Sequence, residues 1–152
     1  GILAARIEAE LHPEQVYGVD MSDGMLDQAR ARSADVTWLK GPAERLPFDD
    51  GSLDAVVTTS AFHFFDQPAA LRDFHRVLAP GGLVAVATIS PPIPGRVRRM
   101  ANQESSVAHS PTPTEMRTLF ADAGFRLSSQ RRVERPLWTR AVWDLITVGS
   151  KD

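Results

Sequence analysis

A single carboxylate, Asp20, ends a short apolar run at a place where it could bind a nucleoside. Residues 16–20, Val-Tyr-Gly-Val-Asp, are typical of a buried parallel strand, and Ser22 can cap a helix that follows. Ligands of open α/β sheets bind at the carboxyl ends of the strands, and an acid at the second strand–helix junction binds the ribose of a nucleotide. Asp20 is therefore predicted to accept hydrogen bonds from two ribose hydroxyls. The alternative is an acid that only caps the next helix.

A histidine, His63, follows the β-branched run of residues 53–59, which favours a buried strand. Because histidine can titrate near neutral pH, His63 is a candidate general base at the ligand edge of the sheet. The alternative is that His63 shapes a pocket between Phe62 and Phe64. Asp66 lies three residues beyond it, but there is no third ligand in sight and no cysteine, so no metal site is predicted.

Alternating helix and strand patterns position these residues. They predict helices over residues 2–11, 22–32, 68–78 and 112–123, ending at Gly124, and strands over residues 16–20, 35–40, 53–59, 83–89, 125–133 and 143–149. Residues 79–82, Ala-Pro-Gly-Gly, should break the chain sharply, and residues 90–111 should form a loop or loosely helical cover. Strands separated by helices form a parallel sheet, and two successive strands at the end imply an antiparallel partner. The sequence predicts one α/β domain, residues 1–152, with a mostly parallel, doubly wound sheet and an antiparallel C-terminal hairpin strand.

The composition narrows the classes of function. With no cysteine among 152 residues, disulfides, thiolate metal sites and cysteine nucleophiles are excluded. A formal net charge of −2 creates no global field toward nucleic acid or a membrane surface. The apolar runs are far shorter than the ~20 residues of a membrane-spanning helix, and no signal peptide is visible. A cytoplasmic protein is expected.

Six arginines could indicate an RNA substrate: Arg96, Arg98, Arg99, Arg131, Arg132 and Arg135. The alternative is a solvated basic face. That alternative is favoured because the net charge is slightly negative and no aromatic stacking surface interleaves the arginines.

Four motifs stand in order along the chain: Val-Tyr-Gly-Val-Asp-Met-Ser with Met25-Leu26, residues 41–48 (Gly-Pro-Ala-Glu-Arg-Leu-Pro-Phe), residues 52–57 (Ser-Leu-Asp-Ala-Val-Val) and residues 75–82 (His-Arg-Val-Leu-Ala-Pro-Gly-Gly). Together they resemble the class I S-adenosylmethionine-dependent methyltransferases of the small-molecule, quinone-biosynthesis-like kind (methyltransferase type 11). The similarity covers nearly the whole chain and implies a Rossmann-like fold.

The resemblance also implies roles for particular residues. Asp20 would bind the ribose of S-adenosylmethionine, and Met21 would pack on the adenine face. Ala43 would present its backbone N–H to the adenine ring, between Pro42 and Glu44. The methionine end of the cofactor would be lined by Ser60, Ala61 and Phe62, and Gly1 would be the last glycine of the family's glycine-rich loop.

Two departures from the family pattern affect these expectations. Pro42 stands where family members usually carry an aspartate that binds the adenine amino group, so Glu44 or a backbone carbonyl would have to substitute. The family's first strand and most of its glycine-rich loop precede Gly1 and are missing from this sequence. Either those residues lie outside this numbering, which we favour, or the sheet closes another way, for example in a homodimer.

Three functional hypotheses follow. The first is methyl transfer from S-adenosylmethionine to a small, hydrophobic acceptor, leaving S-adenosylhomocysteine, with residues 90–111 forming part of an acceptor lid. The second is a nicotinamide-dependent oxidoreductase. The Pro80-Gly81-Gly82 turn, the closing hairpin and the lack of a Tyr-x-x-x-Lys pair argue against it. The third is an inactive, methyltransferase-like fragment or regulatory module.

Overall fold

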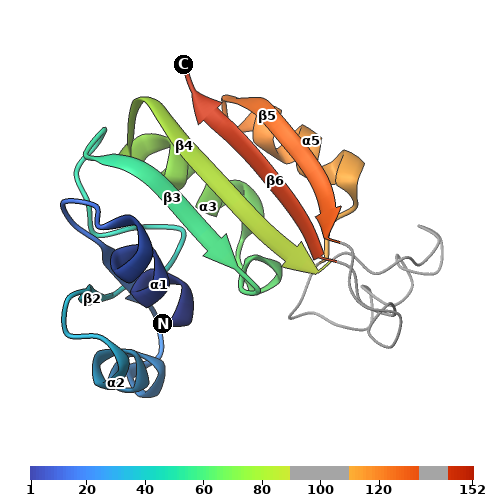
Figure 1. Cartoon of the computed structure of the whole chain (residues 1–152). Coiled ribbons are helices and arrows are strands. Elements are labelled where there is room, and N and C mark those ends of the chain that lie inside the picture. Colours follow the sequence, from blue (N-terminus) through green and yellow to red (C-terminus); the bar gives the residue numbers. More distant parts are fainter. Residues whose placement is uncertain (90–109, 134–143) are drawn as a thin grey trace. The chain divides into compact units, whose positions relative to one another are not determined.

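The computed structural model describes residues 1–89, 110–133 and 144–152 (Figure 1). These residues form two compact units, residues 1–48 and residues 49–152, each with a sheet of its own. The predicted α/β class is confirmed, whereas the single continuous sheet is replaced, in the described part of the chain, by a two-stranded and a four-stranded sheet. A single domain over the whole chain stays a prediction. The cover expected over residues 90–111 lies outside the described residues, except for its last two.

The first unit alternates helix and strand as the sequence predicts. Its elements are α1 (Ile2–Leu11), β1 (Tyr17–Asp20), α2 (Asp23–Arg32) and β2 (Thr37–Lys40). β1 pairs with β2 in parallel, from Tyr17 opposite Thr37 to Asp20 opposite Lys40. Because the two strands run in the same direction, both carboxyl ends lie at one edge of this sheet.

Two local features fix this unit. Ser22 caps α2, its hydroxyl accepting a hydrogen bond from the backbone N–H of Met25, and the helix buries Leu26 and Ala29. In the ladder, Gly18 lies opposite Trp38, whose ring occupies the space that a Cβ at Gly18 would take. The indole N–H of Trp38 donates to the carbonyl oxygen of Ser33 (3.0 Å) and so holds the ring in place.

The second unit is built on the four-stranded sheet. Its elements are β3 (Leu53–Thr59), the 3₁₀ turn η1 (Phe62–Phe64), α3 (Gln67–Val77), β4 (Leu78–Ile89), α5 (Pro113–Asp122), β5 (Phe125–Val133) and β6 (Asp144–Lys151). The strand order is β3-β4-β6-β5. β3 and β4 are parallel, and β6 is antiparallel to both of its neighbours, as expected of a C-terminal hairpin strand.

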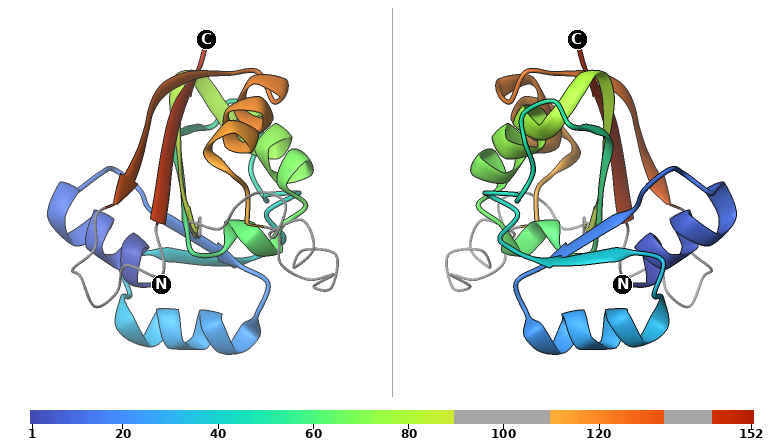
Figure 2. Two further views of the ribbon diagram at one scale, coloured as in Figure 1. Left: turned by 90° about the vertical axis from the view of Figure 1, so that its right-hand side faces the viewer. Right: turned by 90° about the vertical axis from the view of Figure 1, so that its left-hand side faces the viewer.

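Helices α3 and α5 lie on the same face of this sheet (Figure 2). Asp66 caps α3 and a complete capping box formed by Thr112 and Glu115 begins α5, so both helices begin within one residue of the predicted start. The core between helices and sheet is apolar and almost fully buried; it includes Leu71, Phe74, Val77, Val84, Val86, Met116, Phe120 and Leu145.

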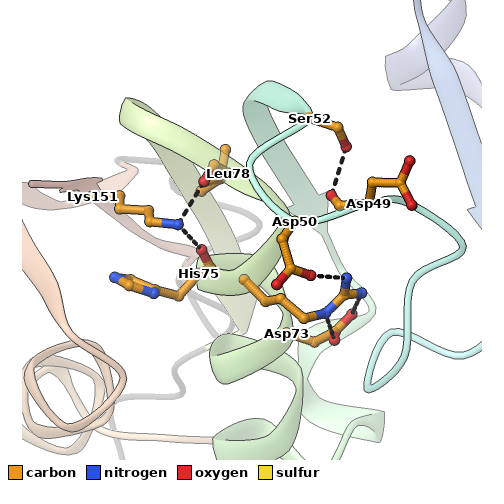
Figure 3. A network of polar contacts seen from close by, with 8 residues as sticks. Asp49, Asp50, Ser52, Asp73, His75, Leu78 and Lys151 are labelled. Carbon is orange, nitrogen blue, oxygen red and sulfur yellow. Dashed lines mark hydrogen bonds and ion pairs between the residues drawn. The ribbon is translucent and has the colours of Figure 1, made fainter.

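The C-terminal end of α3 is held by charged side chains (Figure 3). The ammonium group of Lys151, at the end of β6, donates to the carbonyl oxygens of His75 (2.9 Å) and Leu78 (2.7 Å). These bonds satisfy acceptors that a helix leaves unpaired at its C-terminus, and they place a positive charge at the negative end of its dipole. The last strand is thereby tied to α3.

Arg76 ties the same helix end to the turn before β3. Its guanidinium group donates to both carboxylate oxygens of Asp73 (2.7 and 3.2 Å) and to Asp50 (2.9 Å), and its carbonyl oxygen accepts from the N–H of Gly51 (2.9 Å). The bonds to Asp73, followed by those to Asp50, raise the pKa of Arg76 above its usual value. Figure 3 shows the Ser52 hydroxyl in this turn donating to the carbonyl of Asp49 (2.7 Å).

Three details of the sequence prediction are wrong. β3 was expected to be buried, but it is an edge strand of its described sheet and none of its residues is fully buried. Residues 79–82 do not break the chain. β4 begins at Leu78 and passes through them, with a shift of register against β3. The C-cap of α5 is Ala123 rather than Gly124, which follows with a φ of +90°.

Within the described ranges, no helix has both the length and the apolar character needed to cross a membrane.

Replacing Gly18 by alanine should destabilise the chain by about 1–3 kcal/mol, because the new Cβ overlaps the Trp38 ring and β1 must shift against β2. The matched control is Gly24→Ala in α2. A Cβ there meets nothing closer than the Ser22 hydroxyl at 4.0 Å, so this change should stabilise the helix by up to about 1 kcal/mol. Urea unfolding of both variants tests the packing. Equal stability of the two would contradict it.

The pH dependence of stability should depend on His75. Burial, followed by the nearby charge of Lys151, lowers the pKa of His75 below its ordinary value of 6.5, while a hydrogen bond with the Gly124 backbone opposes the shift. Below pH 6.5 the unfolded chain therefore binds a proton that the folded chain resists, and stability falls as the pH falls. His75→Gln should make this decline shallower in urea titrations between pH 7.5 and pH 5.5. An unchanged slope would show that His75 does not contribute.

Candidate functional site

Asp20 lies at the C-terminal end of β1, as predicted. Its Oδ1 atom accepts a hydrogen bond from the backbone N–H of Ser22 (2.8 Å), so the carboxylate does help to start α2. Its Oδ2 atom makes no hydrogen bond to any residue that the structure describes. The half-buried side chain thus holds the N-cap residue of α2 with one oxygen and has the other available for a ligand.

The end of the neighbouring strand brings a second set of predicted residues to the same edge. The N–H of Gly41 donates to the carbonyl oxygen of Asp20 (3.2 Å), and a turn follows in which Arg45 N–H donates to the carbonyl of Pro42 (3.3 Å). Pro42, Ala43 and Glu44 are half-buried in this turn. The backbone N–H of Ala43 has no hydrogen-bond partner in the described part of the chain and could donate to a ligand.

Methionine side chains add apolar surface beside Asp20. Met21 is 62% exposed and Met25, in the first turn of α2, is 49% exposed. Met21 was predicted from the resemblance, whereas Met25 was not assigned a role although it stands within the motif. Methionine side chains are more often buried than exposed. Two exposed methionines beside Asp20 are suited to contact with a flat aromatic ring.

No role was predicted for Lys40, which lies at this edge of the sheet. It pairs with Asp20 in the ladder, and its ammonium group forms an ion pair with Asp23 in the first turn of α2 (2.6 Å). The pair links the end of β2 to the start of α2. Only its position directly before Gly41 in the second motif could have signalled it.

Gly1 is the N-cap of α1. A Cβ at Gly1 would lie 2.8 Å from the Cβ of Ala29 in α2, so the absence of a side chain permits this close approach.

The other predicted site residues belong to the second unit and follow β3. Ser60 has a left-handed backbone, with a φ of +57°, and its N–H donates to the carbonyl of Ala87 in β4 (3.0 Å). Ala61 precedes η1, and Phe62 is completely buried, its carbonyl accepting from the side-chain amide of Gln67 (3.3 Å). A left-handed serine is strained, and such strain concentrates at functional sites.

His63 lies in the turn that follows. Its ring lies against Phe64, with ring centroids 4.0 Å apart, and the Phe64 side chain is 62% exposed. The Nδ1 atom of His63 is buried and has no hydrogen-bond partner among residues 1–89, 110–133 and 144–152. Among the described residues no group of three His, Cys, Asp or Glu side chains could hold a metal ion. Of the six arginines considered above, only Arg131 and Arg132 lie in the described part, and both are exposed.

Residues 1–86 match the protein family described as a methyltransferase domain, and the chain belongs to this family. It is 39% identical over 100 residues to a demethylmenaquinone methyltransferase of Thermus thermophilus, an alignment covering 62% of this chain and 46% of that protein. It is 30% identical over 127 residues to a malonyl-[acyl-carrier protein] O-methyltransferase of Dechloromonas aromatica, covering 82% of this chain and 47% of that protein. The chain thus spans less than half the length of these relatives.

Solved structures confirm the fold. A complex of the Haloferax volcanii Trm112 methyltransferase activator with a methyltransferase matches with a TM-score of 0.76 and 26% identity, over 95% of this chain and 75% of that one. The geranyl diphosphate C-methyltransferase of Streptomyces coelicolor matches with a TM-score of 0.75 and 14% identity, over 96% and 66% of the two chains. The predicted class I methyltransferase fold is therefore confirmed.

The strained backbone of Ser60 generates a prediction. Ser60→Gly should be neutral or stabilise the chain by up to about 1 kcal/mol, because glycine adopts a positive φ without steric penalty. Thr59→Gly, one residue earlier in β3, should instead destabilise by about 0.5–1 kcal/mol because it weakens a regular strand. Urea unfolding compares the two. A larger loss at Ser60 than at Thr59 would show that the serine side chain, not its backbone, is important there.

Proposed function

We propose that this chain transfers a methyl group from S-adenosylmethionine to a small-molecule acceptor. The observation that carries the proposal is the carboxylate of Asp20, which uses one oxygen for the Ser22 N–H and leaves the other without a described partner. A carboxylate with an available oxygen at a strand end is suited to ribose hydroxyls. Membership of the methyltransferase-domain family supports the same assignment.

The residues of the first unit fit the adenosine part of the cofactor. Asp20 would accept hydrogen bonds from the ribose, and the exposed Met21 side chain would cover one face of the adenine ring. The N–H of Ala43, which has no partner in the ranges that the structure describes, would donate to that ring, with Pro42 and Glu44 beside it. Pro42 carries no side-chain acceptor for the adenine amino group, so recognition there would come from Glu44 or a backbone carbonyl.

Ser60, Ala61 and Phe62 of the second unit would line the methionine end of the cofactor, and Gly1 would belong to its glycine-rich loop. S-adenosylmethionine supplies a methyl group on a sulfonium sulfur, which is already a good leaving group. The protein would therefore act mainly by positioning the acceptor and excluding water. His63 would remove a proton from an acceptor that arrives protonated.

A hydrophobic acceptor is supported by the exposed ring of Phe64 beside His63. The names of the relatives, a demethylmenaquinone methyltransferase and a malonyl-[acyl-carrier protein] O-methyltransferase, likewise describe acceptors that are not nucleic acids. A cytoplasmic location is part of the same proposal.

Binding of S-adenosylhomocysteine tests the assignment. At 100 times its dissociation constant it should stabilise the folded chain by about 2.7 kcal/mol, measured as a rise in melting temperature. Asp20→Ala should abolish the rise. Asp20→Asn should also weaken binding but keep the hydrogen bond from the Ser22 N–H, because its amide oxygen can still accept there. The matched control is Asp27→Ala, an exposed carboxylate of α2 paired with Arg30, which should bind normally.

Each alternative function has its own outcome in this experiment. A melting shift with NADH and none with S-adenosylhomocysteine would replace the proposal by the oxidoreductase hypothesis. No shift with either ligand would favour an inactive module. A normal shift in Asp20→Ala would show that the ribose assignment is wrong.

A further inference from the structure

Two buried polar atoms in the described part of the chain have no hydrogen-bond partner: Nδ1 of His63 and Oγ1 of Thr88. The Thr88 side chain is only 1% exposed. Burying a donor or acceptor without a partner destabilises a folded protein, and native structures rarely do so without a reason. Two such atoms therefore call for a common explanation.

Both atoms lie on elements that contact each other. η1, which carries His63, packs against β4, which carries Thr88. The hydrogen bond from Ser60 N–H to the carbonyl of Ala87 holds the end of β3 beside the residue that precedes Thr88. Figure 1 shows the segment after β3 next to the C-terminal end of β4.

We propose that Thr88 is a positioning residue for His63, its hydroxyl accepting a hydrogen bond from one buried water that in turn accepts from Nδ1–H. A neutral imidazole has a single N–H, and the partner of one nitrogen decides which of the two carries it. With the proton held on Nδ1, the lone pair of His63 is on Nε2. This inference rests on the proposed role of His63 as a base, since a base needs that lone pair.

A packing role for Thr88 predicts a different behaviour. Threonine and valine have nearly the same shape, and on a buried strand face a methyl group in place of an unpaired hydroxyl is neutral or stabilising. If the hydroxyl of Thr88 takes part in the hydrogen bonding of His63, its removal weakens the interaction that holds the proton on Nδ1. Thr88→Val therefore separates the two roles.

The test is long-range ¹H–¹⁵N NMR of the ligand-free chain at a pH where the imidazole is neutral. His63→Gln assigns the ring among the four histidines of the sequence. The wild type should show the Nδ1–H tautomer, and Thr88→Val should shift the tautomer ratio by about tenfold toward Nε2–H, equal to about 1.4 kcal/mol. Thr88→Ser, which keeps the hydroxyl, should restore the wild-type tautomer.

The matched control is Thr147→Val. Thr147 is also fully buried in this sheet, but its hydroxyl accepts from the side chain of Gln130 (3.2 Å), so its loss should leave His63 unchanged.

If Thr88→Val does not fold, Thr88→Ala removes the same hydroxyl. An Nε2–H tautomer in the wild type, or the same tautomer in the wild type and Thr88→Val, would overturn the proposal. Because no cofactor is present, that failure is distinguishable from a failure to bind S-adenosylhomocysteine.

Discussion

The parallel pairing of β1 with β2 is the constraint on which the first half of the candidate site depends. Parallel strands end at the same edge, so pairing Asp20 with Lys40 brings two loops together that are separated by twenty residues of chain. The register is fixed by shape, since the ring of Trp38 fills the space over Gly18. A slip by one residue would turn every side chain of the strand to the opposite face and separate Asp20 from the Ala43 turn.

The two readings of Asp20 that the sequence left open turn out to be compatible. A carboxylate has two oxygens with separate lone pairs, and the hydrogen bond from the N–H of Ser22, the N-cap of α2, occupies only Oδ1. This bond restrains the rotation of the side chain, and so determines where Oδ2 points. The structural role therefore prepares the proposed ligand role, and only the second needs a cofactor to be tested.

Local signals were sufficient to predict most of the fold. Ser22 and the capping box at Thr112 act within one helical turn, and the strands over residues 53–59 and 125–133 have the predicted bounds. Contacts between residues distant in the sequence could not be predicted. The edge position of β3 and the bonds from Lys151 to α3, across more than seventy residues, have no local pattern. The ladder with β3 passes from Leu78 directly to Leu83, so the Pro-Gly-Gly signal at residues 79–82 produces a shift of register within β4 rather than the end of a strand.

The second unit divides stability and chemistry between the two ends of its sheet. At the end where β3 and β4 begin, charged groups are fully engaged: Lys151 satisfies the end of α3, and Arg76 joins Asp73 to Asp50. Residues 75–78 therefore have a structural role in this unit. At the opposite end lie a strained serine and two buried polar atoms, Nδ1 of His63 and Oγ1 of Thr88, that have no hydrogen-bond partner among the residues that the structure describes. The unfavourable features of this unit therefore lie at one end of the sheet, whereas the polar groups described at the other end are hydrogen-bonded. Such an arrangement is expected where a fold gives up stability for function.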